Sequence, residues 1–234
     1  MTRLAAASAA LVLVPVLAAC GSSSSSSTAV DPGSSTSSSP SASAGACDYQ
    51  TDPHGSSKKG ITPPPANPTV SGTVGASLKT TIGTLNVSLD ATHAPCTVSS
   101  FLSLAKQGFY DNTPCHRLVT RGIYVLQCGD PTGTGSGGPG YTIPDELTGK
   151  ETYGAGTLAM ANSGQAHSGG SQFFIVYKDS TANLGKLYTV FGKLDPAGVK
   201  AVAKMAAKGS DNANGPGDGH PKVKVNITKV TQTQ

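Results

Sequence analysis

Hydrophobic and polar residues alternate over short segments in the C-terminal two thirds of the chain. Leu85, Val87 and Leu89 are separated by polar residues, which is the period-two pattern of a strand with one buried face. Further short apolar segments are predicted to be strands and lie at 115–119, 124–128, 157–161, 171–177, 188–194 and 223–227. The first two of these are joined by a tight turn through Arg121-Gly122, so we expect them to form a hairpin.

Two segments have helical spacing instead. The first follows Pro95, a residue favoured in the first turn of a helix, and Gly108 is its predicted stop. Its apolar stripe consists of Val98, Phe101, Leu102 and Ala105. The second predicted helix covers 197–206 and ends at Gly209. Many short strands with two isolated helices predict a mostly β fold.

The N-terminal region has a different pattern. Arg3 precedes an apolar run from Leu4 to Leu17 that is short for a membrane-spanning helix. The run ends in Leu17-Ala18-Ala19-Cys20, which resembles the lipobox of bacterial lipoproteins. We therefore expect residues 1–19 to be a lipoprotein signal peptide and Cys20 to carry a lipid that anchors the protein to the cell membrane. The alternative is an ordinary signal peptide that is cleaved nearby, with Cys20 incidental.

Residues 20–70 are predicted to be a flexible linker. They begin with a tract of Ser, Thr, Ala, Gly and Pro and continue with a Pro- and Lys-rich stretch at 52–67. Such a composition offers little apolar surface to offset the loss of chain entropy on folding. Residues 71–234 remain as one domain, which is long enough to bury a core.

Charge and loop composition exclude two classes of partner. The formal net charge is +4, and no basic run is interleaved with aromatic residues, so nucleic acid is not an expected partner. The Gly-rich segment 133–140 lacks the Gly-Lys-Ser/Thr ending of a phosphate-binding loop, so no nucleotide is expected either. We expect no cofactor.

Apart from Cys20 the chain has four cysteines, namely Cys47, Cys96, Cys115 and Cys128. An even number in an exported protein predicts two disulfides, for which three connectivities exist. We favour Cys115–Cys128 and Cys47–Cys96, because the predicted turn brings Cys115 and Cys128 onto neighbouring strands. A metal or redox site using Cys115, His116 and Cys128 is the alternative, but no Cys-x-x-Cys pair is present, and we expect no metal.

One complication affects the favoured pairing. If Arg117 and Gln127 are direct cross-strand partners, Cys115 falls opposite Gly129 rather than Cys128, and a bulge or offset is needed.

Five short motifs follow one another in a fixed order. They are Cys115-His116-Arg117, Gln127-Cys128-Gly129-Asp130, Met160-Ala161-Asn162-Ser163, Gly170-Ser171-Gln172-Phe173-Phe174-Ile175 and Val190-Phe191-Gly192. Together they resemble the cyclophilin family of peptidyl-prolyl cis-trans isomerases, over about 73–230. The resemblance implies a closed eight-stranded antiparallel β-barrel capped by two α-helices. It also implies isomerisation of X-Pro bonds, here in exported, proline-containing polypeptides outside the cytoplasm.

The resemblance assigns roles to individual residues. Arg117 matches the arginine that donates a hydrogen bond to the twisted prolyl amide, and Gln127 matches the glutamine that supports it. The implied substrate-binding residues are Tyr124, Ala161, Asn162, Phe174, Leu184 and Tyr188. His116 and Phe173 are interpreted as structural. The alternative function is a proline-peptide-binding chaperone or scaffold without turnover, which would not need Arg117 and Gln127.

The chain departs from the family pattern in three places. The spacing from Arg117 to Gln127 is about two residues longer than usual. Tyr124 is the best match to the pocket aromatic, although Ile123 is possible. Asn183 stands where the family often has tryptophan, and the chain contains no tryptophan at all.

Overall fold

The computed structural model describes residues 45–233. The predicted signal peptide, the lipidation site Cys20 and the first half of the predicted linker lie outside these residues. The strands within the described part are β1 (Thr51–Ser56), β2 (Thr73–Thr80), β3 (Gly83–Asp90), β4 (Thr113–Pro114), β5 (Arg117–Val119), β6 (Val125–Cys128), β7 (Pro139–Tyr141), β8 (Thr157–Met160), β9 (Phe173–Val176), β10 (Val190–Leu194), β11 (Asp218–Gly219) and β12 (Asn226–Gln232). The helices are α1 (Pro95–Lys106) and α2 (Pro196–Ala206). Within the described residues, no helix combines the length and the hydrophobicity that a bilayer crossing requires.

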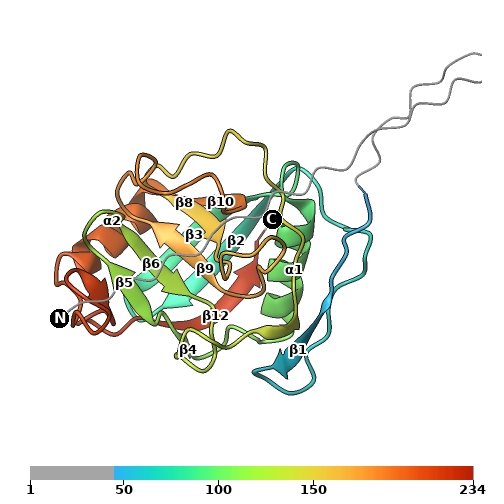
Figure 1. Ribbon diagram of the computed structural model, residues 1–234, viewed down its shortest axis with the longest axis horizontal. Helices are drawn as coiled ribbons and strands as arrows, with labels where there is room; N and C mark the ends of the chain where they lie inside the picture. The colour runs from blue at the N-terminus through green and yellow to red at the C-terminus, as the bar shows by residue number, and fades with distance from the viewer. Residues whose placement is uncertain (1–44, 234) are drawn as a thin grey trace, which may run out of the picture. The chain divides into compact units, whose positions relative to one another are not determined.

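A ten-stranded antiparallel sheet forms the body of the protein, in the order β11-β5-β6-β9-β8-β10-β3-β2-β12-β4. The sheet curls into a half-barrel, with α1 and α2 on opposite sides of it (Figure 1). The mostly β fold with two helices is confirmed. The closed eight-stranded barrel was wrong, because the sheet has ten strands and two free ends.

The two ends of the sheet are connected by the chain rather than by a ladder. The terminal strands β4 and β11 are only two residues long. β4 ends at Pro114, which has no N–H to donate, and β5 begins only three residues later. The N–H of Cys115 donates to the carbonyl of Val225 at 2.8 Å, and the chain then crosses from β4 to β5.

The core lies on the inner face of the curled sheet and is covered by α1. The four residues of the predicted apolar stripe on this helix are all buried. Phe101 places its ring centroid 5.1 Å from that of Tyr110, 5.5 Å from Phe173 and 5.4 Å from Phe191. Aromatic contacts of this kind add to the stability from area burial alone and fix α1 against the central strands.

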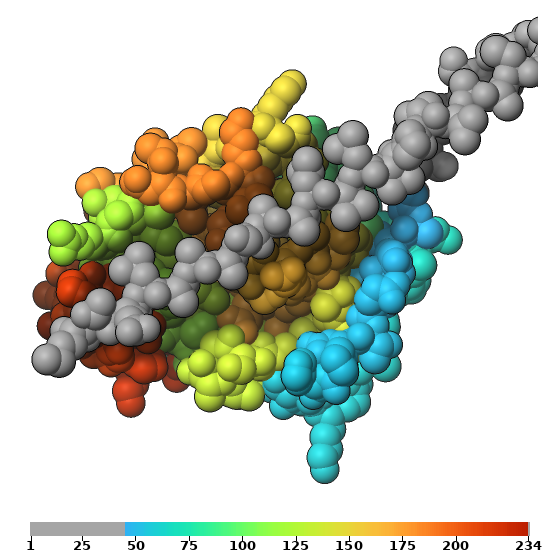
Figure 2. Space-filling model, viewed as in Figure 1, coloured from blue at the N-terminus to red at the C-terminus, as the bar shows by residue number. Residues whose placement is uncertain are grey.

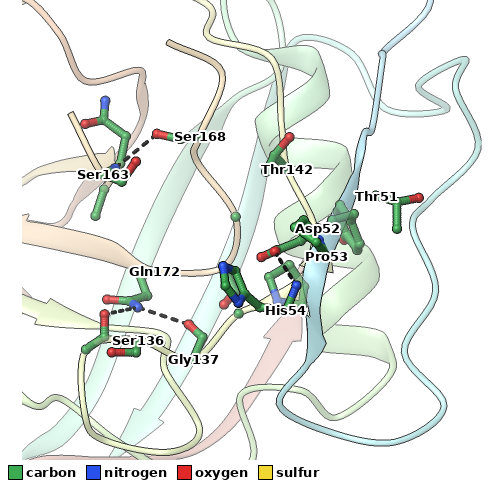
Figure 3. A pocket seen from close by; sticks show the side chains of 18 of the residues that line it. Thr51, Asp52, Pro53, His54, Ser136, Gly137, Thr142, Ser163, Ser168 and Gln172 are labelled. Atoms are coloured by element: carbon green, nitrogen blue, oxygen red, sulfur yellow. Dashed lines mark hydrogen bonds between the residues drawn. The ribbon is translucent and has the colours of Figure 1, made fainter. Parts of the chain in front are cut away.

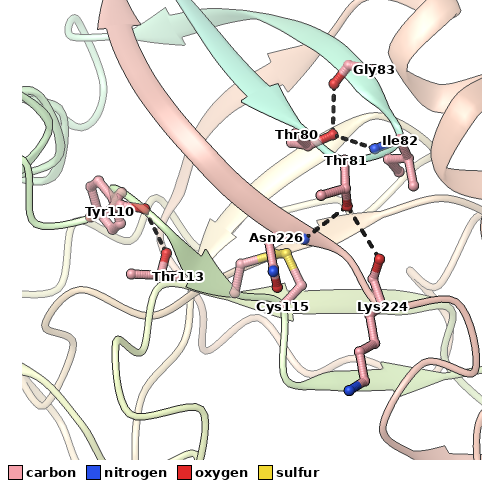
Figure 4. The surroundings of a disulfide bond; sticks show 10 residues. Thr80, Thr81, Ile82, Gly83, Tyr110, Thr113, Cys115, Lys224 and Asn226 are labelled. Atoms are coloured by element: carbon pink, nitrogen blue, oxygen red, sulfur yellow. Dashed lines mark hydrogen bonds between the residues drawn. A yellow bond between two sulfur atoms is a disulfide. The ribbon is translucent and has the colours of Figure 1, made fainter.

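Both predicted disulfides are present, Cys47–Cys96 and Cys115–Cys128. Arg117 and Gln127 are direct partners in the β5–β6 ladder, so Cys115 is indeed offset by one residue from Cys128. The offset is accommodated because the ladder ends at Arg117 and the Cys115 backbone bonds to Val225 instead. Figure 4 shows this disulfide beside β4 and the start of β12, where the two ends of the sheet meet.

Residues 45–70, which we expected to be linker, contain ordered structure. β1 pairs with β7, and the N–H of Cys47 donates to the carbonyl of Ala66 at 2.7 Å. Cys47 is buried and bonded to the first turn of α1. Figure 2 shows this blue segment packed against the yellow-green atoms of the loop before β7. The segment is held by a disulfide and by backbone pairing, neither of which depends on a hydrophobic pattern.

Candidate active site

Arg117 and Gln127 lie side by side on β5 and β6. They are paired residues of the ladder, so their side chains project from the same face of the sheet. The Arg117 Nη1 donates to Gln127 Oε1 at 3.3 Å. Both side chains are half-buried. The chain between Arg117 and Gln127 turns around Gly122, which has a φ of 78°. The longer spacing between the two residues therefore leaves their pairing intact.

Asp218 on β11 holds the other side of the Arg117 guanidinium. Arg117 Nε donates to Asp218 Oδ1 at 2.8 Å, and Nη2 donates to Oδ2 at 2.6 Å. Asn214 Nδ2 donates to the same Oδ1 at 3.2 Å. Hydrogen bonding between the two side chains lowers the pKa of Asp218 and raises the pKa of Arg117. The result is a bidentate, charge-assisted pair that fixes the plane of the guanidinium.

Gln127 is fixed by a chain of amide hydrogen bonds. Its Nε2 donates to Gln172 Oε1 at 2.9 Å. The Gln172 Nε2 in turn donates to the carbonyls of Gly135 at 2.8 Å and Gly137 at 3.0 Å. The Gly-rich segment therefore anchors the site through its backbone. Gln172 belongs to one of the sequence motifs, but its positioning role was not predicted.

A small cavity of about 120 Å³ lies beside Arg117 and Gln127, with both polar and apolar groups in its lining. The cavity is lined by Arg117, Ile123, Val125, Gln127, Ala161, Asn162, Phe174, Leu184 and Tyr188. With one exception, the structure brings together every residue assigned to catalysis and substrate binding. The exception is Tyr124.

Tyr124 faces away from the cavity, and Ile123 occupies the expected place. Ile123 and Val125 both line the cavity, whereas Tyr124 between them does not. The Tyr124 ring packs 6.0 Å from that of Tyr177 and lies 4.4 Å below Lys178 Nζ. Of the two residues that the sequence offered for the pocket aromatic position, the cavity lining therefore includes Ile123 and not Tyr124.

Phe173 and Phe174 illustrate the same alternation on β9. Phe173 belongs to the main core, and Phe174 belongs to a second apolar cluster on the outer face of the sheet. The Phe174 ring meets Tyr188 edge-on at 5.2 Å and lies 6.4 Å from Tyr153. Tyr153 is itself tied to the backbone of Tyr188 by hydrogen bonds of 3.2 Å. The floor of the cavity is thus a rigid aromatic group.

The segment Ala161–Ser163 extends β8 past the cavity. The Ala161 N–H donates to the Gln172 carbonyl at 2.9 Å, which ties the segment to β9. The side chain of Asn162 is fixed at both ends, since Nδ2 donates to the Leu187 carbonyl at 2.8 Å and Oδ1 accepts from Gly164 at 3.1 Å. Among residues 45–233, the backbone N–H and C=O of Asn162 have no hydrogen-bond partner. They are available to an extended peptide.

A larger cavity of about 520 Å³ adjoins the first and shares Gln127, Ala161 and Asn162 with it (Figure 3). Ser163 and Ser168 border one side, and residues of β1 border the opposite side. The two cavities therefore form one groove with a narrow end at Arg117 and a wide end at β1.

His116 and Asn183, the other residues considered from sequence, line neither cavity. Burial lowers the pKa of His116, and its Nδ1 is buried without a partner among the described residues. Asn183 Nδ2 donates to the carbonyl of Gly122 at 2.8 Å and so stabilises the long turn between β5 and β6. Within residues 45–233, no group of three or more His, Cys, Asp or Glu side chains could hold a metal ion.

Comparisons with known proteins agree with this geometry. The family model described as "Cyclophilin type peptidyl-prolyl cis-trans isomerase/CLD" matches residues 76–232. A probable peptidyl-prolyl cis-trans isomerase B of Mycobacterium tuberculosis is 42% identical over 205 residues, which cover 81% of this chain and 65% of that protein. The peptidyl-prolyl cis-trans isomerase B of Bacillus subtilis is 49% identical over 102 residues, or 43% of this chain and 68% of that protein. The chain thus spans less than two thirds of the length of the mycobacterial relative.

Solved structures lead to the same family. The crystal structure of a cyclophilin type peptidyl-prolyl cis-trans isomerase of Cryptosporidium parvum has a TM-score of 0.60 at 29% identity, covering 69% of this chain and 98% of that one. A second crystal structure of that protein, in the presence of the dipeptide Ala-Pro, has a TM-score of 0.59 at 30% identity, covering 68% of this chain and 99% of that one. This chain belongs to the family of cyclophilin-type peptidyl-prolyl cis-trans isomerases.

Proposed function

We propose that the protein is a peptidyl-prolyl cis-trans isomerase that accelerates rotation about X-Pro bonds in exported polypeptides. The observation that carries this proposal is the position of Arg117. Its guanidinium lines a small cavity that also contains apolar side chains, and it is held rigidly by Asp218 and Gln127.

The cavity is suited to a proline ring. Its volume of about 120 Å³ is well below the roughly 300–1,000 Å³ typical of drug-sized ligand sites. Phe174, Leu184, Val125 and Ile123 supply apolar surface, as a ring of methylene groups requires. The free backbone groups of Asn162 can pair with the peptide on one side of that ring.

Rotation about an X-Pro bond is slow because the amide has partial double-bond character, with a barrier of about 18–20 kcal/mol. Twisting the bond removes the resonance and leaves a prolyl nitrogen that can accept a hydrogen bond. A donor that is already in place stabilises this twisted state more than either planar isomer. The reaction breaks no covalent bond, so it requires neither a nucleophile nor a general base.

Arg117 can supply this donor while its fork stays fixed. A guanidinium has five N–H groups, and three of them are engaged by Asp218 and Gln127. The remaining two, one on Nη1 and one on Nη2, are available to the substrate. Because Arg117 already has its geometry before the peptide binds, little side-chain entropy is lost in the transition state.

We also propose that the protein acts outside the cytoplasm and is anchored by a lipid on Cys20. Two disulfides between buried cysteines are consistent with an oxidising compartment. The lipobox-like sequence supports the anchor. Mass spectrometry of the mature N-terminus tests it, since a chain that begins elsewhere and carries no lipid would contradict this part of the proposal.

The isomerase activity is tested by NMR exchange on a short X-Pro peptide with the purified protein. We expect the protein to increase the rate of cis–trans exchange while leaving the equilibrium ratio of the free peptide unchanged. If the peptide binds but its exchange is not accelerated, the protein is a proline-peptide-binding module and the isomerase proposal fails.

A further inference from the structure

Strand β1 lies outside the region matched by the family model, which begins at residue 76. It nevertheless borders the wide part of the groove, where Thr51, Asp52, Pro53 and His54 line the 520 Å³ cavity. This wall is therefore an addition to the family domain in this chain.

A large bulge turns these residues towards the cavity. In the ladder with β7, Thr51 is opposite Tyr141 and Ser56 is opposite Pro139. Four residues of β1 thus face the single residue Gly140, and the extra chain must leave the line of the ladder. Gly55 at the end of the bulge has a φ of 71°. Gly140 gives the bulge the space it needs, because a Cβ at this position would lie 2.8 Å from Ser56 N.

The bulge is anchored at both ends. The Thr142 N–H donates to the Gln50 carbonyl at 2.8 Å, and the Ser57 N–H donates to the Gly138 carbonyl at 2.9 Å. The Gly138 N–H returns a hydrogen bond to Ser57 Oγ at 2.8 Å. The Cys47–Cys96 disulfide ties the preceding chain to α1. A wall held in this way keeps its side chains in place when a peptide enters.

Asp52 is the only carboxylate among the residues that line the cavity. Its Oδ1 accepts a hydrogen bond from the His54 N–H at 2.9 Å. Its Oδ2 faces the Gly-rich segment, 4.0 Å from the position of a Cβ on Gly138, and accepts no hydrogen bond from any residue between 45 and 233. Figure 3 shows the Asp52 carboxylate and the His54 ring on the β1 side of the cavity.

The rest of the lining is uncharged apart from the titratable imidazole of His54. It consists largely of hydroxyl, amide and backbone groups, including Ser136, Thr142, Ser163, Ser168 and Gln172. A cationic side chain would meet a free carboxylate oxygen and several hydroxyl acceptors here, whereas an anionic one would meet a like charge.

We infer that the β1 bulge is a specificity-determining wall of the substrate groove, and that Asp52 favours substrates with a lysine or arginine within a few residues of the isomerised proline. This inference rests on the proposed isomerase function, because the groove leads from Asp52 to the cavity at Arg117.

The test uses peptide sets that differ at one position within three residues of the proline, on either side, where they carry Lys, Gln or Glu. Measurements are made at low salt and at one fixed pH. We expect kcat/KM for the Lys peptide to exceed that for the Glu peptide by about two- to fivefold at one position, the range of a partly exposed ion pair. The preference should shrink at high salt.

Variants assign the preference to Asp52. Asp52→Asn should bring the Lys-to-Glu ratio close to one, and Asp52→Lys should invert it. Asp48→Asn is the matched control, because Asp48 is an exposed carboxylate of the same segment that does not line the cavity, and it should leave the ratio unchanged. Thermal unfolding and the intact Cys47–Cys96 disulfide establish that each variant is folded.

Two results would overturn the inference. One is equal kcat/KM for Lys and Glu peptides at every position, and the other is a ratio that survives Asp52→Asn. If no peptide is isomerised at all, the proposed function fails instead, and fluorescence anisotropy with the same peptides then decides. Tighter binding of a Lys peptide that is lost in Asp52→Asn supports the wall, and equal binding contradicts it.

Discussion

Asp218 binds Arg117 through two of its three guanidinium nitrogens, with Nε–Oδ1 and Nη2–Oδ2 distances of 2.8 and 2.6 Å. The two residues are 101 positions apart in the chain and meet because β11 pairs with β5. Asp218 does not line either cavity, so under the proposed function we expect it to act only by positioning Arg117.

Replacing Asp218 should therefore reduce turnover without reducing peptide affinity. We expect Asp218→Asn to lower kcat by up to about 10²-fold, since a misplacement of about 1 Å can cost that much, with KM nearly unchanged. Asp218→Glu should recover part of the loss. Asp179→Asn is the control, because Asp179 is exposed and has no contact with Arg117. A proportional loss of kcat and of folded protein in Asp218→Asn would indicate a merely structural role.

Because Arg117 binds the Asp218 carboxylate, we expect the free energy of unfolding to decrease at acidic pH. The hydrogen bond from Arg117 lowers the pKa of Asp218 from its usual value of 3.8. The stabilisation is therefore fully present above that value and is lost as the pH falls through the lowered pKa of the folded protein. In urea unfolding between pH 5 and pH 2, wild type should lose more stability than Asp218→Asn. Parallel pH curves for the two proteins would contradict this.

Glu146 should stabilise the start of α1 from a distance. Ala94 is the N-cap residue, and its side chain makes no capping hydrogen bond. Glu146 instead accepts hydrogen bonds from the N–H groups of Cys96 at 2.8 Å and Thr97 at 2.9 Å. Glu146→Ala should lower the free energy of unfolding by about 1–2 kcal/mol, as the loss of a helix cap does. A change below a few tenths of a kcal/mol in urea unfolding would show that the contact is unimportant.

The two neighbouring phenylalanines of β9 should separate stability from binding. Phe173→Leu alters the main core and should mainly reduce the free energy of unfolding, by about 1 kcal/mol or more. Phe174→Leu alters the wall of the small cavity and should mainly raise the dissociation constant of an X-Pro peptide. Calorimetry and peptide titration of both variants provide the comparison. Equal effects on peptide binding would show that Phe174 does not form the proline pocket.

The sequence predicted the central elements because each follows a simple local pattern of apolar residues. β3, α1, β9 and α2 lie close to their predicted positions, and the motif residues meet as the family resemblance implied. β2 was missed although Val74, Ala76 and Leu78 alternate, since Gly75 and Lys79 weaken its strand signal. The last strand starts at Asn226 rather than at residue 223.

The remaining differences depend on long-range contacts. β1 and β7 pair across a long stretch of chain, since Ser56 of β1 is opposite Pro139 of β7, and no local pattern encodes that register. Asp218 lies in a two-residue strand that pairs with β5, and so short a strand has no recognisable sequence pattern. The position of Tyr124 depended on which residue of an extended segment faces the cavity, and a shift of one residue reverses the answer.

The central claim concerns Arg117 and is tested most directly by comparing Arg117→Ala with Arg121→Ala in one isomerase assay. Arg121 is the matched control because it is an exposed arginine in the adjacent turn and lines neither cavity. Loss of one preorganised donor typically costs about 10²–10³ in rate, so kcat/KM of Arg117→Ala should fall by that factor with peptide affinity nearly unchanged. Arg117→Lys should restore little, because an ammonium group cannot reproduce the fork held by Asp218. A folded Arg117→Ala protein that isomerises peptides as efficiently as Arg121→Ala would contradict the account.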